Sequence, residues 1–456
     1  FSGTITPPLV TASGGLNFAG GVTLNGGKLV NSGIATWSVG TITAANGAVI
    51  TNMPSGTFNL TFDGHLASGA GAAPAFNNAG LFRKTAGIAS ANFTLAFNNS
   101  GTVDNQSGTL SLDSGGSHIG TFNTAAGAVV DLGGGTHTLS AATVVSGTGA
   151  LGVSGASTVT ASGTFNSGST LSLTAGTVTL ASSCNVTAAT VTIGGGTLNY
   201  NSSGTVNVVN LNAGTLGGTG PATVTGLLTL GNGTVTTPLV TANGGINFAG
   251  GVTLNGGKLV NSGIATWSVG NITGANGAAI TNLPSGTINN TFDGNMPSGA
   301  GATPIFVNQG LFQKSGGTLA LGATSIDFDF INTGTVEVRT NTLRYNFNQQ
   351  LAGLTLLNGG GLSEEARQWF ADRTPAYRKE LISRTETIRA SNAGSNALYK
   401  GWGAKQKEWL ATSDERTRPE HVEANGQVVG MDEKFSVGGE DMEYPGDPAG
   451  SPSNFC

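Results

Sequence analysis

Charged side chains are scarce in this 456-residue sequence, where Asp, Glu, Lys and Arg together make up 9%, against about 25% in an average soluble protein. The net charge of −5 gives no electrostatic reason to expect nucleic acid as a partner. The charges are also unevenly distributed: residues 1–360 contain 7 Lys/Arg and 8 Asp/Glu, whereas residues 361–456 contain 12 and 16. This change predicts a boundary, with a junction at residues 356–363 between a first region (1–355) and a C-terminal domain (364–456).

Cysteine and long apolar runs are also lacking. Cys184 and Cys456 lie far apart in the sequence and suggest no disulfide framework. No run of roughly 18 apolar residues is present, so we expect no membrane span. The sequence begins at Phe1 without Met or a charged-then-apolar leader, and we interpret it as a fragment or a processed chain. This beginning leaves export undecided, and nothing in the composition points to a cofactor.

Residues 1–360 have no sustained helical spacing of apolar residues, but they are rich in glycine and short alternating runs. The segments "STLSLTAGTVTLASS" (169–183) and "ATVTIGGGTLNY" (189–200) alternate apolar and small polar residues and break at glycine, which is the strand signal. The pattern recurs at roughly 20 residues, as in stacked-coil proteins. We therefore predict a mainly β protein: a long parallel β-solenoid followed by a small α+β domain.

In such a solenoid, Val, Leu, Ile and Phe would face inward, and Gly, Ser, Thr and Asn would occupy the corners and outer faces. An antiparallel sandwich or barrel is the ordered alternative, although 360 residues would exceed one usual domain. Glycine-rich composition also permits disorder, but the steady apolar repeat and the scattered aromatic residues argue against it.

One block of the first region is duplicated. Residues 17–40 recur letter for letter at 247–270, and the resemblance extends over about 6–84 and 236–314. A stacked coil requires only a pattern of residue types, so packing cannot demand identity at outward positions. The repeat indicates recent duplication and identifies no active site. Trp37 and Trp267 occupy equivalent places, and we interpret them as core residues rather than a carbohydrate platform.

The acidic residues of the first region are scattered along the sequence. They are Asp63, Asp104, Asp113, Asp131, Asp293, Asp327, Asp329 and Glu337. Asp327 and Asp329 alone have the i, i+2 spacing that would place them on one strand face, and a solvated face is the simpler interpretation. We interpret His65, His118 and His137, each within two residues of a glycine, as surface residues. In composition the region weakly resembles adhesin and autotransporter passenger segments, which implies a surface-exposed shaft.

The C-terminal region changes to helical spacing. Ser363 is a plausible N-cap, with Glu364 and Glu365 in the first turn. We expect two or three helices through about Glu408, and short strands and turns over residues 414–456.

This region resembles the phage minor head, or head-morphogenesis, proteins typified by the F protein of phage Mu. Four segments carry the resemblance in order: "RTETIRASNAG" (384–394), "KEWLATSDERTRPEH" (407–421), "NGQVVGMDEKF" (425–435) and "YPGDPAGSPSNFC" (444–456). Asn425 stands where the family usually has Asp, and the sequence stops at Cys456, about where the family's terminal Asn-Cys-Arg-Cys is completed, so we expect a truncated domain. The motif residues are Arg384, Thr385, Glu386, Asn392, Trp409, Asp414, Arg416, Arg418, His421, Gly426, Asp432, Phe435, Tyr444, Pro445, Gly446, Asp447 and Cys456.

These residues suggest a structural or interaction role. Asp414, Arg416, Arg418, His421 and Asp432 could form a polar network that fixes a small domain. A metal site using His421 and Cys456 is the alternative, although further ligands are too few. A nucleophilic Cys–His pair is a third reading. We expect neither catalytic nor metal-binding residues.

The resemblance implies a virion component of the phage head near the portal vertex, with phage portal and capsid proteins as partners in head assembly or DNA packaging. Because the residues form no recognisable catalytic constellation, we expect no enzymatic activity. A bacterial surface or extracellular adhesin, binding a glycan or receptor through the solenoid, is the alternative. A chimera of two unrelated reading frames is another, and an enzyme is a fourth.

Overall fold

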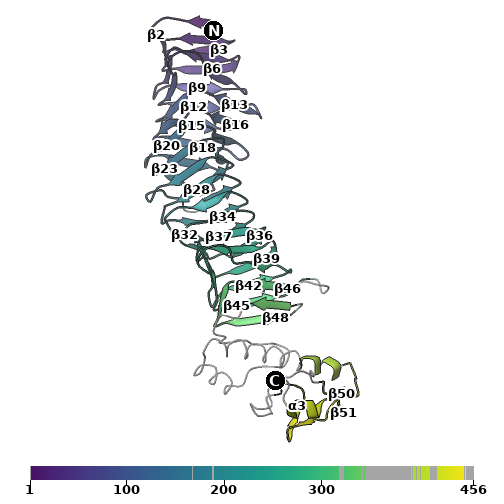
Figure 1. The fold of residues 1–456 in the computed structure, drawn as a ribbon. Helices are drawn as coiled ribbons and strands as arrows, with labels where there is room; N and C mark the ends of the chain where they lie inside the picture. The colour runs from purple at the N-terminus through teal and green to yellow at the C-terminus, as the bar shows by residue number, and fades with distance from the viewer. Residues whose placement is uncertain are drawn as a thin grey trace.

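The computed structural model describes residues 2–166, 168–186, 189–317, 323–339, 342–345, 392, 394–396, 398–400, 402–410, 419–445 and 447. The first region is a parallel β-solenoid, as predicted (Figure 1). Each turn adds one strand to a 17-stranded sheet. The following strands of the same turn join other sheets, and the chain then returns to the 17-stranded sheet to begin the next turn. Parallel pairs join residues 18–30 positions apart, with Thr190 and Val208 at the short end and Asn295 and Ser325 at the long end.

The 17-stranded sheet runs the whole length of the solenoid. Its strands, in order, are β1 (Gly3–Ile5), β4 (Val22–Asn25), β7 (Ile42–Ala45), β10 (His65–Ser68), β13 (Ser90–Phe93), β16 (Thr109–Leu112), β19 (Val129–Leu132), β22 (Ala150–Val153), β25 (Thr170–Leu173), β27 (Thr190–Ile193), β30 (Val208–Leu211), β33 (Leu228–Leu230), β36 (Ile246–Ala249), β39 (Ile264–Val269), β42 (Thr287–Asn290), β45 (Leu311–Lys314) and β48 (Thr335–Val338).

A 14-stranded sheet forms a second side. Its strands are β2 (Leu9–Ala12), β5 (Lys28–Asn31), β8 (Val49–Asn52), β11 (Ala75–Asn78), β14 (Ala96–Asn99), β17 (Gly116–His118), β20 (Thr136–Leu139), β23 (Thr158–Ala161), β26 (Thr177–Leu180), β28 (Thr197–Tyr200), β31 (Thr215–Gly217), β34 (Thr234–Val235), β37 (Val252–Asn255) and β40 (Ile272–Ala275). A three-stranded sheet near the end of the solenoid contains β43 (Asn295–Met296), β46 (Ala323–Ile326) and β49 (Thr342–Tyr345).

Two further sheets take the third strand of the turns. The 8-stranded sheet contains β3 (Leu16–Ala19), β6 (Ile34–Val39), β9 (Thr57–Leu60), β12 (Leu81–Lys84), β15 (Thr102–Asn105), β18 (Thr121–Thr124), β21 (Val144–Gly147) and β24 (Thr164–Phe165). The 7-stranded sheet contains β29 (Thr205–Val206), β32 (Ala222–Val224), β35 (Val240–Ala242), β38 (Lys258–Asn261), β41 (Ala279–Asn282), β44 (Ile305–Asn308) and β47 (Asp329–Asn332).

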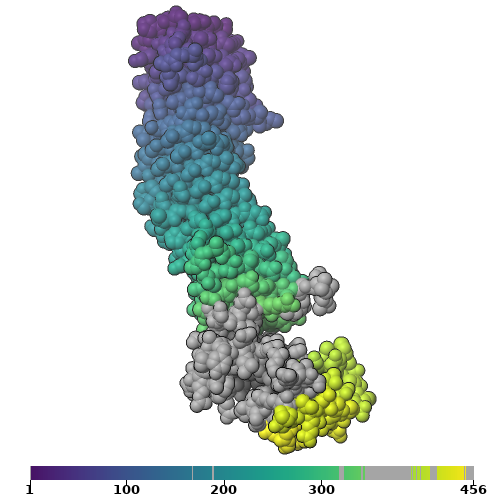
Figure 2. Space-filling view, viewed as in Figure 1, coloured from purple at the N-terminus to yellow at the C-terminus, as the bar shows by residue number. Residues whose placement is uncertain are grey.

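The core of the solenoid is one continuous column of stacked apolar side chains. Residues alternate inward and outward along most strands, and one apolar cluster extends from Ile5 to Val336. Trp37 and Trp267 are fully buried, as predicted, and each indole Nε1 donates to a nearby carbonyl, of Gly40 at 3.0 Å and of Gly270 at 2.8 Å. Figure 2 shows the result as an elongated column of successive layers.

Tight corners require glycine where neighbouring turns approach closely. At Gly40, which has φ +84°, an added Cβ would lie 2.4 Å from the backbone carbon of Gly20 one turn away. Asn46 has φ +53° and is followed by Gly47 at φ +75°, which are the left-handed values that an Asn-Gly corner supplies. The sequence punctuation therefore marks corners, as predicted.

The two copies of the duplicated block lie on different sides of the solenoid. The identical strands β6 and β39 belong to the 8-stranded and the 17-stranded sheet, respectively. The identical β4 and β37 likewise belong to the 17-stranded and 14-stranded sheets. The duplication therefore does not span a whole number of turns, and it places the same outward residues on a different side.

Asparagine occupies the interior, contrary to the prediction that it would lie at corners and outer faces. Asn31, Asn52, Asn78 and Asn99 are buried and in register, and each Nδ2 donates to the next Oδ1 at 2.8–2.9 Å. A second ladder joins Asn261, Asn282, Asn308 and Asn332 at 2.7–2.9 Å. The ladder satisfies the buried amides because each one bonds to an identical group on the next turn.

The C-terminal module contains few regular elements within the described residues. Strand β50 (Gln406–Glu408) pairs antiparallel with β51 (Val428–Gly430), and β52 (Phe435–Val437) forms a hairpin with β53 (Glu440–Met442). Helix α3 spans Pro419–Ala424. Two expectations were wrong here. Residues 406–408 are a strand and not the end of a helix, and α3 replaces one of the expected turns because Pro419 and Glu420 suit a helical first turn. Among the described residues, no helix is long and apolar enough to cross a membrane.

We predict that Asn78→Ala lowers the stability of its turns by about 2–3 kcal/mol, because the change leaves buried donors and acceptors unpaired. Asn78 Nδ2 also donates to the carbonyls of Gly80 and Thr102, at 3.2 and 3.0 Å. The matched control is Asn77→Ala, which removes a neighbouring outward amide. Urea unfolding, followed by hydrogen exchange, should show a lower free energy of unfolding for Asn78→Ala and an unchanged one for Asn77→Ala. Equal shifts for both variants would contradict a structural role of the ladder.

Candidate functional site in the C-terminal module

An aromatic cluster forms the centre of the C-terminal module. The ring of Trp409 meets His421 and Phe435 edge to face, with centroids 5.7 and 5.3 Å apart. All three side chains are buried, together with Ala424, Val437 and Met442. Three of the family-motif residues therefore come together as the core of the module.

Backbone hydrogen bonds fix the turn beside this cluster. Trp409 N donates to Gln427 O at 2.9 Å, and Gly426 N donates to Trp409 O at 2.8 Å. Gly426 has φ +83°, a left-handed value that favours glycine. Asn425 lies in the same turn, as predicted from its place in the sequence.

The motif residues near the end of the module form a second structural feature. Asp447 is buried, its Oδ2 accepts from Glu443 N at 2.6 Å, and its own N donates to Tyr444 O at 3.0 Å. Asn392 Nδ2 donates to Pro445 O at 3.1 Å and so ties a distant part of the chain to this turn. The Asp447 carboxylate and backbone thus hold Glu443 and Tyr444 in a turn.

Lys407 links this turn to the aromatic cluster. Its Nζ donates to Glu443 O at 3.0 Å and lies 5.3 Å from the centre of the Phe435 ring. Burial lowers the pKa of Lys407, and the nearby Glu443 carboxylate opposes this shift. The ammonium therefore serves as a positioned structural donor.

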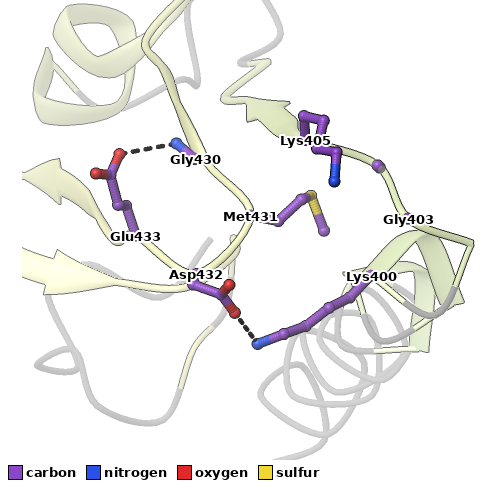
Figure 3. A pocket seen from close by; sticks show the side chains of 8 residues that line it. Lys400, Gly403, Lys405, Gly430, Met431, Asp432 and Glu433 are labelled. Atoms are coloured by element: carbon purple, nitrogen blue, oxygen red, sulfur yellow. Dashed lines mark hydrogen bonds and ion pairs between the residues drawn. The ribbon is translucent and has the colours of Figure 1, made fainter.

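Asp432 lies on the surface, beside an open hollow of ≈ 400 Å³ (Figure 3). The hollow is lined by Lys400, Gly403, Ala404, Lys405, Gly430, Met431, Asp432 and Glu433. Asp432 forms an ion pair with Lys400, and this hydrogen bond lowers the pKa of Asp432 and raises that of Lys400. Glu433 Oε2 accepts from Gly430 N at 2.9 Å. The hollow has charges of both signs and presents a surface rather than an enclosed ligand site.

The structure separates two residues of the expected polar network. His421 is buried against Trp409, whereas the Asp432 side chain is 79% exposed and faces Lys400. Arg384, Thr385, Glu386, Asp414, Arg416, Arg418, Gly446 and Cys456 lie outside the described residues. Within the described part of the chain, no group of three His, Cys, Asp or Glu side chains is placed to hold a metal ion.

The candidate residues of the solenoid differ from expectation in two respects. Asp327 and Asp329 do not share a strand, because β46 ends at Ile326 and β47 begins at Asp329 beyond a corner. His65 is exposed, as predicted, but His118 and His137 are fully buried. The second error arises because an inward position follows two residues after a glycine, at Gly116 and at Gly135, so closeness to glycine does not indicate exposure.

Sequence reasoning also missed a buried ion pair that occurs in both copies of the block. Lys84 is fully buried, and its Nζ contacts Asp63 Oδ1 at 3.0 Å and donates to Ser107 O at 2.9 Å. Its copy Lys314 is buried in the same way, 2.9 Å from Asp293 Oδ1. The available signal was strand parity, because Lys84 has the same parity as the inward Phe82. Burial opposes ionisation of Asp63, but its bonds to Lys84 and to Ala89 N outweigh this and lower its pKa.

Burial also shifts the pKa of two other groups of the solenoid, Asp131 and Cys184. Burial raises the pKa of Asp131, and the Asp113 carboxylate adds to this, while hydroxyl donors Ser154 and Ser111 oppose it. Burial also raises the pKa of the Cys184 thiol to about 12, so this thiol stays protonated and unreactive at neutral pH.

Comparison with known proteins identifies one family. Residues 352–448 match the family model described as Phage Mu protein F like protein, in agreement with the resemblance of the C-terminal motifs. An NAD(+)--arginine ADP-ribosyltransferase (EFV) of Enterococcus faecalis (strain ATCC 700802 / V583) is 31% identical over 143 residues. That alignment covers 28% of this chain and 29% of the relative, so the chain spans less than a third of the relative's length. No solved structure matches the chain.

We predict that Trp409→Ala destabilises the C-terminal module by about 3–5 kcal/mol, because it empties the centre of the aromatic cluster. Trp402→Ala is the control, since Trp402 is 72% exposed and Trp409 only 1%. Hydrogen exchange of α3 and β52 should accelerate strongly in the first variant and stay near the parent rate in the second. The core assignment fails if Trp409→Ala leaves exchange unchanged.

We predict that Lys84→Ala destabilises its turns by about 3 kcal/mol, because it leaves several carbonyl groups and Asp63 without their buried partner. The neighbouring Arg83→Ala removes a partly exposed ion pair with Asp104 and should change stability by less than about 1 kcal/mol. The measurement is the urea midpoint of each variant. A larger shift for Arg83→Ala would show that the outward pair, and not the buried one, stabilises these turns.

Proposed function

We propose that this chain is a phage or prophage head-morphogenesis protein, structural and non-enzymatic, which acts in virion assembly near the portal. The observation that carries the proposal is the family match over residues 352–448. The described motif residues support it: Trp409 and Phe435 build a core and Asp447 holds a turn, so the segment has the features of a folded module. Portal or capsid proteins are the proposed partners, and the phage head is the proposed location.

The solenoid supplies a structural extension in this proposal. Its 17-stranded sheet implies a length of about 80 Å at the usual strand spacing of about 4.8 Å. Its charged groups support a structural role, because Asp63, Asp104 and Asp293 are each paired with a lysine or arginine. An adhesin of the bacterial surface, which would bind a glycan or receptor along the shaft, is the second candidate that the solenoid favours.

The relative's name raises a third possibility. NAD-dependent transfer of ADP-ribose to arginine is an activity of that protein, of which this chain covers 29%. We propose that this chain lacks it. Incubation of the full chain with labelled NAD and an arginine-rich acceptor protein should then give no transfer above a no-protein control, and transfer would overturn the non-enzymatic proposal.

We predict that particles purified from an induced lysogen contain peptides from both the solenoid and residues 419–445, in equal amounts and a fixed ratio to the portal protein. The matched experiment is surface labelling of uninduced cells, which should not label the solenoid. Solenoid peptides on the cell surface, without C-terminal peptides in particles, would favour the adhesin. If each fraction contains peptides from only one half of the chain, the two halves come from unrelated reading frames. One unbroken sequencing read of the DNA that encodes residues 356–363 would then decide between one gene and two.

A further inference from the structure

Two histidines meet inside the solenoid on adjacent strands of the 14-stranded sheet. His118, on β17, and His137, on β20, are both fully buried. Their rings stack at an interplanar angle of 16°, and His118 Nε2 lies 3.0 Å from His137 Nδ1. His118 stands in register with Asn99, the last member of the first asparagine ladder. His118 therefore continues the polar column of the interior by one step, and His137, which is in register with Gly116, contacts it diagonally from the next turn.

The hydrogen bonds define one arrangement of protons. His137 Nε2 lies 3.0 Å from Gly134 O and 3.2 Å from Leu112 O, so this nitrogen carries a hydrogen. His137 Nδ1 therefore accepts from His118 Nε2–H, and both rings are neutral. His118 Nδ1 is then an unprotonated acceptor, and it has no partner within the described chain.

Every protonated form of the pair leaves a buried donor unpaired. A proton added to His118 Nδ1 creates an N–H without an acceptor, beside the edge-on ring of Phe122 with centroids 5.0 Å apart. A proton added to His137 Nδ1 would place two N–H groups, this one and His118 Nε2–H, face to face. The clash is relieved only if the hydrogen of His118 moves from Nε2 to Nδ1, which has no partner within the described chain. Each ionised form therefore combines a buried charge with an unsatisfied donor.

The neighbouring elements offer little compensation. Strands β14, β18 and β23, which lie around the pair, contain no ionisable side chain. Asp113, after β16, favours ionisation of His137, and Asp131 on β19 is held by the Ser154 hydroxyl. Burial outweighs these effects: it lowers the pKa of His118 to about 3, with a further contribution from His137, and it also lowers the pKa of His137.

We propose that the His118–His137 pair is an acid-sensitive latch: the two neutral rings hold β17 against β20 at neutral pH, and mildly acidic solution opens these turns locally while the remaining turns stay folded. The sign follows from proton binding. Below pH 6.5 the opened state binds protons that the closed state excludes, so closure weakens as the pH falls toward about 3. The opening equilibrium should rise up to about tenfold per pH unit for each histidine.

The test is feasible because the sequence contains only four histidines. In the full chain labelled with ¹³C-histidine, the His118 and His137 ring signals should not titrate between pH 8 and 5.5, because both rings stay neutral in the closed solenoid. Hydrogen exchange, corrected for intrinsic rates, should show protection of β17 and β20 falling up to about 100-fold per histidine between pH 6.5 and 4.5. Protection of β25 and β27 should stay constant.

Two variants complete the test. His118→Asn places at this position the residue that already stands at Asn99 and supplies a neutral donor to His137; it should reduce the acid-induced loss of protection about 100-fold. His65→Gln should leave that loss unchanged. The proposal would be overturned if the signals of both buried rings titrated between pH 8 and 5.5 while the rest of the spectrum stayed unchanged. It would also be overturned by equal loss of protection in β17 and β25. If His118→Asn fails to fold, the titration of the parent chain still decides.

Discussion

The stacking of identical positions on successive turns is the constraint on which the rest of the structure depends. In a parallel solenoid, an inward side chain contacts the inward side chains of the turns before and after it, about 4.8 Å away. An apolar residue satisfies this arrangement directly, as the continuous cluster from Ile5 to Val336 shows. A polar residue is stable inside only if it bonds to its own neighbours along the axis or to the corner carbonyls. The two asparagine ladders, the Lys84 and Lys314 sites and the histidine pair all meet this condition.

The ladders also show where the condition is incompletely met. Asn31 and Asn261 begin their ladders, and in each case the residue in register on the preceding turn is an alanine. Their Oδ1 atoms have no partner within the described chain. An unpartnered buried acceptor is destabilising, so a ladder is most favourable when it is long, since only its first member lacks a donor. This explains why asparagine recurs at one strand position over four turns rather than singly.

The shifted duplication indicates that the sides of the solenoid are interchangeable. The strand sequence Ile-Ala-Thr-Trp-Ser-Val has the same pattern of buried and exposed residues in β6 and β39, although the two strands lie in different sheets. Each side therefore imposes the same inward and outward alternation. The duplicated block recurs at an offset of 230 residues, which is not a whole number of turns, and it still fits because the next strand meets an equivalent surface. Packing tolerates the repeat, but it does not require the identity of the outward residues.

The sequence allowed prediction of the architecture but not of the interior chemistry. Alternation and glycine corners sufficed for the solenoid, since both are local properties. Strand parity places Asn78, Lys84 and His118 inward, and this local signal was available in the sequence. The partners that satisfy these buried groups lie one turn away, which no local pattern reveals. In the C-terminal module, family resemblance identified Trp409, Phe435 and Asp447, yet their roles as core and turn depend on contacts between segments distant in sequence. The Gln406–Glu408 strand was missed for the same reason, because its partner β51 lies beyond α3.

The distribution of charge connects this architecture with the proposed function. A shaft with few charged groups, several of which are paired with their own neighbours, as Arg83 is with Asp104, gains little specificity from electrostatics along its length. The C-terminal module instead exposes the Lys400–Asp432 ion pair and an aromatic pair, Tyr399 and Trp402. Tyr and Trp are enriched among the residues that carry the binding energy of protein interfaces. Under the proposed function, the module would bind the partner protein and the solenoid would serve as the extension. The histidine pair adds a third property, because a stack of turns that only nearest neighbours stabilise can open at one position without unfolding elsewhere.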